Sequence, residues 1–579
     1  MARSKCSPPW FEGSVPEGSY RSLLKWGDPR VTKHPNSGMV KLLLDTFSMS
    51  CGDFVVPVDL ALDRVEVDVP VKLDQSVLDF LISISGAENI RTDTYTRIDR
   101  AYGGGMIDAL RLRKHIIENL PECVVSPRSQ AEIETIVRYC NEQRLAVYIY
   151  GGGSSVTRGF EAVGGGICLD MSKHMNRVVR FNEMDQTITV EAGMSGPQLE
   201  DLLNHAPEKL GAKRRYTCGH FPQSFEYSTV GGWVVTRGAG QNSTYYGKIE
   251  DLVIAQEYVT PMGVFKTPEQ PRAATGPDFD QLMMGSEGCF GVLSNVTLRI
   301  SRYQPQNRRR FSYMFRNWQD AQAACREVMQ SEFGFPSVFR LSDPEETDVA
   351  MKLYHIEGTP ADTALKIAGY QPMQKCLLLG HTEGERAFSA NVNRKIRQIC
   401  RKYGAFDLSF APVTKMWEKG RFLDPYMRED LQDFGIAIDT LECAVTWSQM
   451  AEVHQRVRVV VKARPQTVCM THVSHAYPQG ANLYFIFVAK TNKISEYLDL
   501  QYSILEEIQK SGASMSHHHG VGKQTAPWLE GQIGKPSMDV IRTLKNHFDP
   551  NNIMNPGGTL GLDLSDEQRT KIWSRNLEH

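Results

Sequence analysis

Three consecutive histidines, His517, His518 and His519, are the most chemically versatile residues of this chain. Imidazole has an unperturbed pKa close to neutrality, so such a group can act as an acid, a base or an anion binder. Neighbouring side chains of a turn or strand point in different directions, so we do not expect all three to contact one small substrate. Gly520 and Gly522 allow a tight turn beside them. Histidine clusters also occur in metal sites and solvated loops, and the tripeptide alone leaves these alternatives open.

A glycine loop follows a predicted strand in the first half of the chain. Residues 145–150 form an apolar run that predicts the strand, and Gly151, Gly152 and Gly153 come directly after it. Because glycine has no Cβ atom, these backbone amides can approach a pyrophosphate closely. The loop matches neither the Walker pattern nor the G-x-G-x-x-G fingerprint, so a plain turn is the alternative interpretation.

The elements around this loop indicate an α/β nucleotide-binding unit. Residues 123–125 predict a strand, Ser129 a helix cap, and the apolar residues of 133–140 recur at helical spacing. Strand, helix, strand and glycine loop then follow in the order typical of such units. Residues 258–264 predict a hairpin, and residues 284–292 form a second glycine-rich loop.

Composition limits the class of protein. The chain has 579 residues, of which 41% are apolar, so we expect a soluble protein of three or four folding units. Lys and Arg total 65 against 67 for Asp and Glu, which gives no reason to expect nucleic acid as a partner. Twelve cysteines without a Cys-x-x-Cys pair argue against a disulfide framework and favour a reducing compartment. No transmembrane helix or secretory signal is recognisable, so an intracellular protein is expected.

Together with residues 222–232 (Pro-Gln-Ser-Phe-Glu-Tyr-Ser-Thr-Val-Gly-Gly), these segments resemble the FAD-binding domain of the vanillyl-alcohol oxidase family, the PCMH-type fold. The resemblance spans residues 122–302 and implies FAD as the cofactor. Some members attach flavin through a histidine where this chain has Ser154, so noncovalent FAD is implied. The implied cofactor-binding residues are Tyr150, Gly151, Gly152, Gly153, Ser154, Ser155, Val156, Gln223, Ser224, Phe225, Glu226, Tyr227, Ser228, Thr229, Thr236, Arg237, Gly238, Ala239, Glu287, Gly288, Cys289, Phe290, Gly291, Val292 and Leu293.

The resemblance also implies an α+β fold class with four parts. A helical N-terminal extension would occupy residues 1–119, and a PCMH-type FAD-binding domain of two α/β subdomains residues 120–302. An α+β substrate-binding cap with an antiparallel sheet would follow at 303–548, and a C-terminal segment at 549–579 would close on the FAD domain. The last three residues, Leu-Glu-His, resemble the start of an expression tag.

Four segments of the expected cap narrow the resemblance. Residues 335–343, 424–430 and 481–487 and the histidine run resemble the alkyldihydroxyacetonephosphate synthases, which make ether lipids. Flavin-dependent 2-hydroxyacid dehydrogenases carry Ser-Gly-Glu-His-Gly-x-Gly where this chain has Ser-His-His-His-Gly-Val-Gly at 516–522. This difference favours the synthases. A flavin-dependent 2-hydroxyacid or alcohol oxidase is the first alternative, and a non-catalytic flavoprotein is the second.

The resemblance implies a reaction without net redox change. The acyl chain of 1-acyl-dihydroxyacetone phosphate would be exchanged for a long-chain fatty alcohol through a substrate adduct at flavin N5, with release of a fatty acid. It further implies a homodimer, peripheral membrane contact and a peroxisomal location.

Site residues carried over from the synthases are Tyr484, Arg340, Arg428 and the three histidines. Tyr484 would move the C1 proton if neighbouring cations lowered its pKa, although its aromatic strand also fits simple packing. The two arginines suit phosphate and carboxylate, and a local ion pair with Asp343, Glu429 or Asp430 is the alternative for each. The histidines would surround the phosphate. No metal is expected, because no acid or cysteine lies near them in the sequence.

Overall fold

The predicted strand–helix–strand unit forms the first sheet of the cofactor domain in the computed structural model, which describes residues 6–564. Its strand order is β1-β2-β4-β3, and β2, β4 and β3 run parallel. Ser129 caps the helix by accepting a hydrogen bond from the amide of Glu132 at 3.3 Å, as its position indicated. The elements are β1 (Ile90–Arg91), β2 (Cys123–Val125), α6 (Gln130–Gln143), β3 (Val147–Tyr150) and β4 (Ile167–Asp170).

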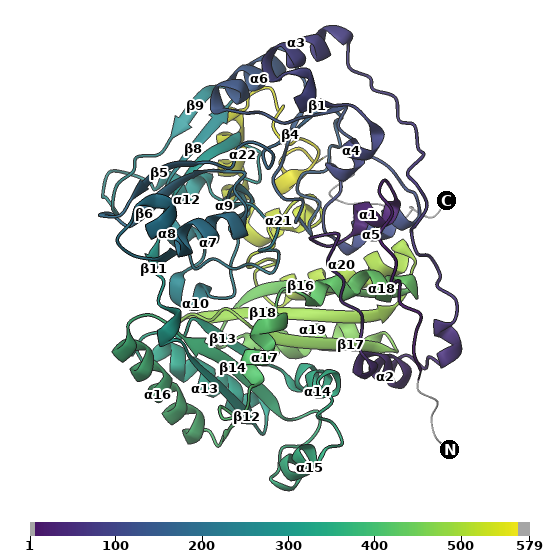
Figure 1. The fold of residues 1–579 in the computed structure, drawn as a ribbon, viewed down its shortest axis with the longest axis vertical. Coiled ribbons are helices and arrows are strands. Elements are labelled where there is room, and N and C mark those ends of the chain that lie inside the picture. The colour runs from purple at the N-terminus through teal and green to yellow at the C-terminus, as the bar shows by residue number, and fades with distance from the viewer. Residues whose placement is uncertain (1–5, 565–579) are drawn as a thin grey trace.

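A second, antiparallel sheet completes this domain with the order β5-β6-β10-β8-β9 (Figure 1). The hairpin predicted at 258–264 is confirmed by β8 and β9, which pair from Thr260 opposite Gly263. The elements of this lobe are β5 (Val178–Asn182), β6 (Thr187–Glu191), α7 (Gly196–Asn204), α8 (Ala206–Leu210), β7 (Tyr216–Thr217), α9 (Val230–Val235), α10 (Ser243–Tyr246), α11 (Ile249–Leu252), β8 (Val253–Thr260), β9 (Gly263–Lys266), α12 (Phe279–Met283), β10 (Val292–Arg299) and β11 (Ser301–Arg302).

The cap is built on a seven-stranded antiparallel sheet of order β15-β12-β14-β13-β17-β18-β16. Helices α13, α16, α19 and α20 share one hydrophobic core with this sheet. The elements are β12 (Arg309–Phe315), α13 (Trp318–Gln330), β13 (Val338–Ser342), α14 (Pro344–Leu353), α15 (Pro360–Ile367), β14 (Cys376–Thr382), α16 (Arg386–Lys402), β15 (Phe406–Asp407), α17 (Val413–Gly420), α18 (Arg428–Asp433), β16 (Ile436–Thr446), α19 (Met450–Ala463), β17 (Thr467–Val473), β18 (Gly480–Lys490) and α20 (Ile494–Lys510).

Helices predominate in the N-terminal 119 residues, and they pack on both larger domains. Strand β1 pairs with β2 and helix α3 packs against α6, so the second part of this segment belongs to the FAD-domain sheet. The first part contacts the cap, where α2 lies on α14. These helices are too short to be stable alone and depend on packing against larger units. They are α1 (Tyr20–Leu24), α2 (Ser37–Thr46), α3 (Gln75–Ser85), α4 (Thr94–Asp99) and α5 (Met106–Arg113).

The chain returns from the cap to the cofactor domain before the predicted boundary at 548. Helices α21 (Ala526–Ile533) and α22 (Lys535–Phe548) precede it, and the ring of Phe548 packs on Phe265 and Phe290. Met554 then forms a parallel bridge with Val147 at the edge of β3. The closing segment at 549–564 therefore lies against the FAD domain, whereas the last fifteen residues, 565–579, and the tag-like ending fall outside the described part.

Within residues 6–564, no helix has both the length and the apolar character that a membrane crossing requires.

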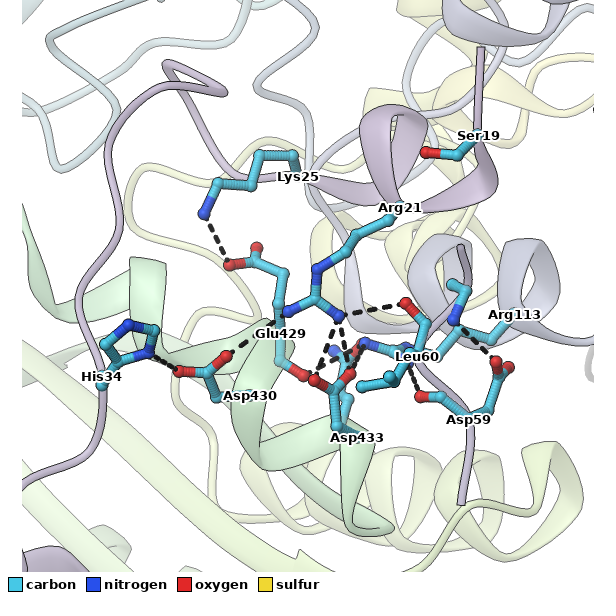
Figure 2. A network of polar contacts seen from close by, with 12 residues as sticks. Ser19, Arg21, Lys25, His34, Asp59, Leu60, Arg113, Glu429, Asp430 and Asp433 are labelled. Carbon is cyan, nitrogen blue, oxygen red and sulfur yellow. Dashed lines mark hydrogen bonds and ion pairs between the residues drawn. The ribbon is translucent and has the colours of Figure 1, made fainter. Parts of the chain in front are cut away.

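A buried ionic cluster joins the N-terminal segment to α18 (Figure 2). Arg21 and Arg113 both donate to the carboxylate of Asp433, at 2.9 and 2.8 Å, and the side chains of all three are at least 94% buried. The amide of Trp26 donates to Glu429 at 2.9 Å, and Nδ1 of His34 lies 2.6 Å from Asp430. The acidic residues of α18 are thus held by basic groups from the start of the chain.

Replacement of Asp433 by Asn should destabilise the protein strongly. Two buried guanidinium groups would lose their shared counter-charge, and breaking a buried pair in this way costs about 3–5 kcal/mol. The measurement is the urea midpoint of unfolding. Asp539→Asn, which removes an exposed carboxylate of α22, is the matched control and should leave the midpoint unchanged. Equal midpoints for the two variants would contradict the structural role given to the cluster.

Candidate active site

One cavity of about 980 Å³ is lined by both domains. The predicted residues on its wall are Gly151, Gly152, Gly153, Ser154, Ser155, Val156, Gln223, Ser224, Thr229, Thr236, Gly238, Ala239, Glu287, Gly288, Gly291, Leu293, Arg340, Arg428, Tyr484, His518 and His519. Predicted cofactor residues that do not line it are Tyr150, Phe225, Glu226, Tyr227, Ser228, Arg237, Cys289, Phe290 and Val292. Several of these support the wall from behind.

The first glycine loop needs its glycines because another loop lies against it. A Cβ atom on Gly152 would be 2.0 Å from the carbonyl oxygen of Tyr227, and one on Gly151 would be 2.4 Å from Oγ1 of Thr229. The amide of Gly104 also donates to the carbonyl of Ser155 at 2.8 Å. The loop therefore presents its backbone to the cavity, which is what close approach to a pyrophosphate requires.

The second glycine loop is tied to the histidine segment through Glu287. Its carboxylate accepts hydrogen bonds from the amides of Val521 at 2.6 Å and Gly522 at 2.7 Å. Burial raises the pKa of Glu287 to about 7, although the two amides oppose the shift. The φ of Glu287 is +48°, a left-handed conformation that a glutamate adopts at some cost in energy. This contact joins the cofactor domain to the loop that carries the histidines.

A second buried carboxylate, that of Glu442 in β16, holds the other end of the same loop. It accepts from the hydroxyl of Ser516 at 2.9 Å and from the backbone amides of His517, His518 and His519 at 2.7, 3.0 and 3.1 Å. Glu442 is 2% exposed. Charge-assisted bonds of this kind are about twice as strong as neutral ones, so the four donors fix the loop conformation.

The three imidazoles diverge from this anchor. His518 and His519 face the cavity, whereas Nε2 of His517 lies 2.8 Å from the hydroxyl of Tyr477. Burial, together with the neighbouring imidazoles and Lys248, holds the pKa of His517 and His518 well below the ordinary value. Both rings are therefore neutral at physiological pH.

Tyr484 lies in β18 with its ring among histidines. Its ring stacks on His472 at 4.8 Å and lies 5.5 Å from the ring of His519. Its hydroxyl donates to Oγ1 of Thr440 at 3.1 Å. Burial raises the pKa of Tyr484 to about 12, and the carboxylate of Glu442 adds to the shift. The condition set for proton transfer by Tyr484, a pKa lowered by neighbouring cations, is not met here, because desolvation and nearby carboxylates outweigh the cations.

Arg340, in β13, does not pair with Asp343, the local ion pair considered from the sequence. Its guanidinium donates to Glu346 at 2.5 Å and lies 3.0 Å from Nδ1 of His472, while Asp343 is bound by His454 and Arg458. Burial opposes ionisation of Glu346, but His472 and Arg340 lower its pKa to about 2. The charge of Arg340 is thus largely compensated within the protein.

Among the described residues, Arg428 at the start of α18 forms no ion pair comparable to that of Arg340 with Glu346. Its Nη1 donates to the carbonyl of Gly104 at 2.8 Å, and its guanidinium lies over the ring of Trp26. The predicted alternative of a pair with Glu429 or Asp430 is wrong, because both acids bind the N-terminal segment (Figure 2). Within residues 6–564, no carboxylate lies within ion-pair distance of Arg428.

Sequence reasoning missed four residues that hold these groups in place. Glu346, Glu442, His472 and His475 are all buried or nearly so. A usable signal exists for Glu442, because it is an acid flanked by Leu441 and Cys443 in a mostly apolar strand, a position that burial permits only with hydrogen-bond partners. His472 is brought to the site by the register of β17 and β18, which places it opposite Tyr484. Glu346 comes from α14, and His475 from the segment after β17.

Two family models match the chain. Residues 121–267 match the FAD binding domain, and residues 304–559 match the C-terminal domain of FAD linked oxidases. The chain belongs to the FAD-linked oxidase family, and FAD is its cofactor. The cavity fits this cofactor, since a closely packed glycine loop forms one wall and could hold the pyrophosphate by its amides.

Within that family, the chain resembles the alkyldihydroxyacetonephosphate synthases over most of its length. It is 28% identical to the enzyme of that name from Dictyostelium discoideum over 86% of this chain and 82% of the relative. A solved structure of an alkyldihydroxyacetonephosphate synthase superimposes with a TM-score of 0.77, at 25% identity over 92% of this chain and 98% of that one. Substrate-bound p-cresol methylhydroxylase shares the fold, with a TM-score of 0.64 and 15% identity over 85% of this chain and 98% of that one.

Replacement of Glu442 by Gln should loosen the histidine loop and leave FAD bound. The amide side of Gln cannot accept from the loop donors, and hydrogen bonds to a charged group contribute about 1.5–3 kcal/mol each. Hydrogen exchange at the amides of residues 517–519 should become about tenfold to a hundredfold faster. Glu452→Gln, on the exposed face of α19, is the control. Unchanged exchange in the Glu442 variant would refute the anchoring role.

Proposed function

We propose that this protein is an alkyldihydroxyacetonephosphate synthase, which exchanges the acyl chain of 1-acyl-dihydroxyacetone phosphate for a long-chain fatty alcohol. One observation carries the proposal: a single cavity joins the FAD-binding loops, a polar end that includes Arg340 and Arg428, and an apolar extension through the cap. A phosphorylated head group, a flavin and two alkyl chains need these three surroundings side by side. The chain's similarity to synthases over most of its length supports the same reading.

The apolar extension suits acyl and alkyl chains. The cavity reaches α14, α15 and α17, and of these α14 and α15 lie far from the cofactor domain in Figure 1. Each methylene removed from water contributes about 0.8 kcal/mol, so a chain of many carbons gains most of its affinity here. Apolar side chains on this wall are Met314, Leu353, Ile356, Leu365, Leu377, Leu379, Phe410 and Met416.

We assign one substrate anion to Arg428 and the other to Arg340, according to the acidic partners that each arginine already has. Within residues 6–564, Arg428 forms no ion pair with a carboxylate, although Asp439 and Glu429 lie near enough to feel its charge, so its guanidinium can bind a phosphate dianion directly. Arg340 already shares its charge with Glu346, which suits the departing carboxylate, a weaker and transient anion. Phosphate bound beside His518 would also raise the lowered pKa of that residue and make it a better proton acceptor.

Tyr484 acts as a neutral phenol in this proposal. Its pKa of about 12 keeps a proton on oxygen, so it can donate a hydrogen bond to the substrate, or accept the C1 proton on its oxygen while it gives its own proton to a neighbouring imidazole. His519 lies against its ring edge and His472 beneath its face. FAD, when bound, supplies an electron-accepting ring system next to these groups. Because Ser154 stands in the first glycine loop, we propose that FAD is held noncovalently.

Peripheral membrane contact is part of the proposal. Phe410 lines the cavity and is also 81% exposed, so the apolar extension opens at this point. Ile367 at the end of α15 is 84% exposed. Two such side chains suit contact with a lipid surface that supplies the substrates. A peroxisomal location and a homodimer are proposed on the family resemblance alone.

The decisive assay supplies palmitoyl-dihydroxyacetone phosphate and labelled hexadecanol to the FAD-loaded protein. A labelled ether product and free palmitate are expected in equal amounts, with the flavin spectrum unchanged after turnover. Failure to form the ether would overturn the proposal. Bleaching of the flavin by a 2-hydroxyacid without oxygen would identify an oxidase or dehydrogenase instead.

Replacement of Tyr484 by Phe should lower kcat by at least about 100-fold, the usual contribution of a positioned proton-transfer group, and leave FAD content unchanged. Because the pKa of Tyr484 is about 12, its ionisation should not appear in the pH–rate profile of the native enzyme below about pH 11. Tyr313→Phe is the matched control, because Tyr313 is a buried tyrosine of β12 that does not line the cavity. Retained activity in the Tyr484 variant would remove this residue from the mechanism.

A further inference from the structure

A third histidine completes a cluster with two residues of the histidine run. His475 follows strand β17 and lies with its ring 5.1 Å from that of His517 and 5.0 Å from that of His518. One ring nitrogen from each of the three lies within 4.8 Å of the others. The sequence argued against a metal site because no ligand lay nearby in the chain. The fold brings in His475 as a third ligand, 42 residues before His517 in the sequence.

The hydrogen bonds around the cluster leave one nitrogen of each ring directed inward. Nδ1 of His475 lies 2.9 Å from Oγ of Ser474, and its Nε2 is buried without a hydrogen-bond partner. Nε2 of His517 contacts the Tyr477 hydroxyl at 2.8 Å, which leaves its Nδ1. That atom faces Nδ1 of His518 at only 2.9 Å. Two imidazole nitrogens at this distance share at most one proton, so the cluster has surplus acceptor capacity.

We propose that His475 Nε2, His517 Nδ1 and His518 Nδ1 bind one divalent transition-metal ion of the Zn²⁺ class. Imidazole is a preferred ligand of such ions, at about 2.0–2.1 Å per bond, and the three rings each offer one nitrogen within 4.8 Å of the other two. Ser474 and Tyr477 then bind the outer nitrogens of two ligands, the arrangement that orients metal-bound histidines in proteins.

The cluster would leave the ion one accessible position. His475 and His518 line the large cavity, whereas His517 lies behind them, so a fourth ligand would come from the cavity side. Three protein ligands with one open position define a site that can bind water or an anionic oxygen. The proposal does not rest on the proposed reaction, because metal binding is measured without substrate.

Charges near the cluster oppose one another. Oε2 of Glu442 lies 3.6 Å from Nδ1 of His518, and its negative charge favours a bound cation. The positive charge of Lys248 disfavours a bound cation, but its ammonium group donates to the carbonyl oxygen of His517 at 2.8 Å. The nearby carboxylate thus offsets the nearby ammonium, and the affinity depends on the three imidazoles.

The test is Zn²⁺ titration of untagged, FAD-loaded protein by calorimetry, followed by X-ray absorption at the zinc edge. We expect one equivalent bound and a shell of three nitrogens at about 2.0 Å. His475→Ala should weaken binding by at least about 100-fold, and Tyr477→Phe by about 10-fold to 100-fold through the lost outer hydrogen bond. His205→Ala, on the exposed surface, should bind as the native protein does.

FAD content and the thermal midpoint of each variant show whether that variant is folded. The X-ray absorption measurement uses the native protein and does not depend on any variant. Absence of a bound equivalent, a shell with fewer than three nitrogens, or unchanged binding by His475→Ala would each overturn the proposal.

Discussion

The active-site loop depends on two buried carboxylates that come from different domains. Glu442 of the cap accepts the amides of residues 517–519, and Glu287 of the cofactor domain accepts those of Val521 and Gly522. A buried carboxylate is costly to desolvate unless hydrogen-bond donors surround it. Both acids meet this requirement with backbone amides of a single loop. The loop is therefore the joint that sets the polar end of the cap against the glycine loops.

The register of the cap strands positions the proposed catalytic side chains relative to this loop. The pairing of β16 with β18 places Glu442 opposite Tyr484, and the pairing of β17 with β18 places His472 opposite Tyr484 on the other side. Arg340 reaches the same region from β13 and contacts His472. Because a slip of one residue would turn every one of these side chains to the opposite face, the sheet also specifies the chemistry of the cavity.

The parts of the fold that depend on local signals could be predicted from the sequence. The helix cap at Ser129 and the β8–β9 hairpin depend on neighbours within a few residues, and both are where the pattern placed them. The partners of Arg340 and Arg428 could not be found in this way. The acids adjacent to Arg428 in sequence bind the start of the chain, about 400 residues away, as in Trp26 to Glu429. The raised pKa of Tyr484 could not be foreseen for a similar reason, since Glu442 and the depth of burial are properties of the assembled sheet.

The ionic cluster on α18 has a consequence for synthesis of the chain on the ribosome. Arg21 is made early, but its partner Asp433 follows 412 residues later. During this interval the first segment has basic groups and no acidic helix to receive them, and closing so long a loop is entropically costly. Correct placement of Arg428 must wait until the two ends meet, so the synthase site is completed late in folding. Deletion of the segment that carries Arg21 would therefore disturb a cavity that lies far from it in sequence.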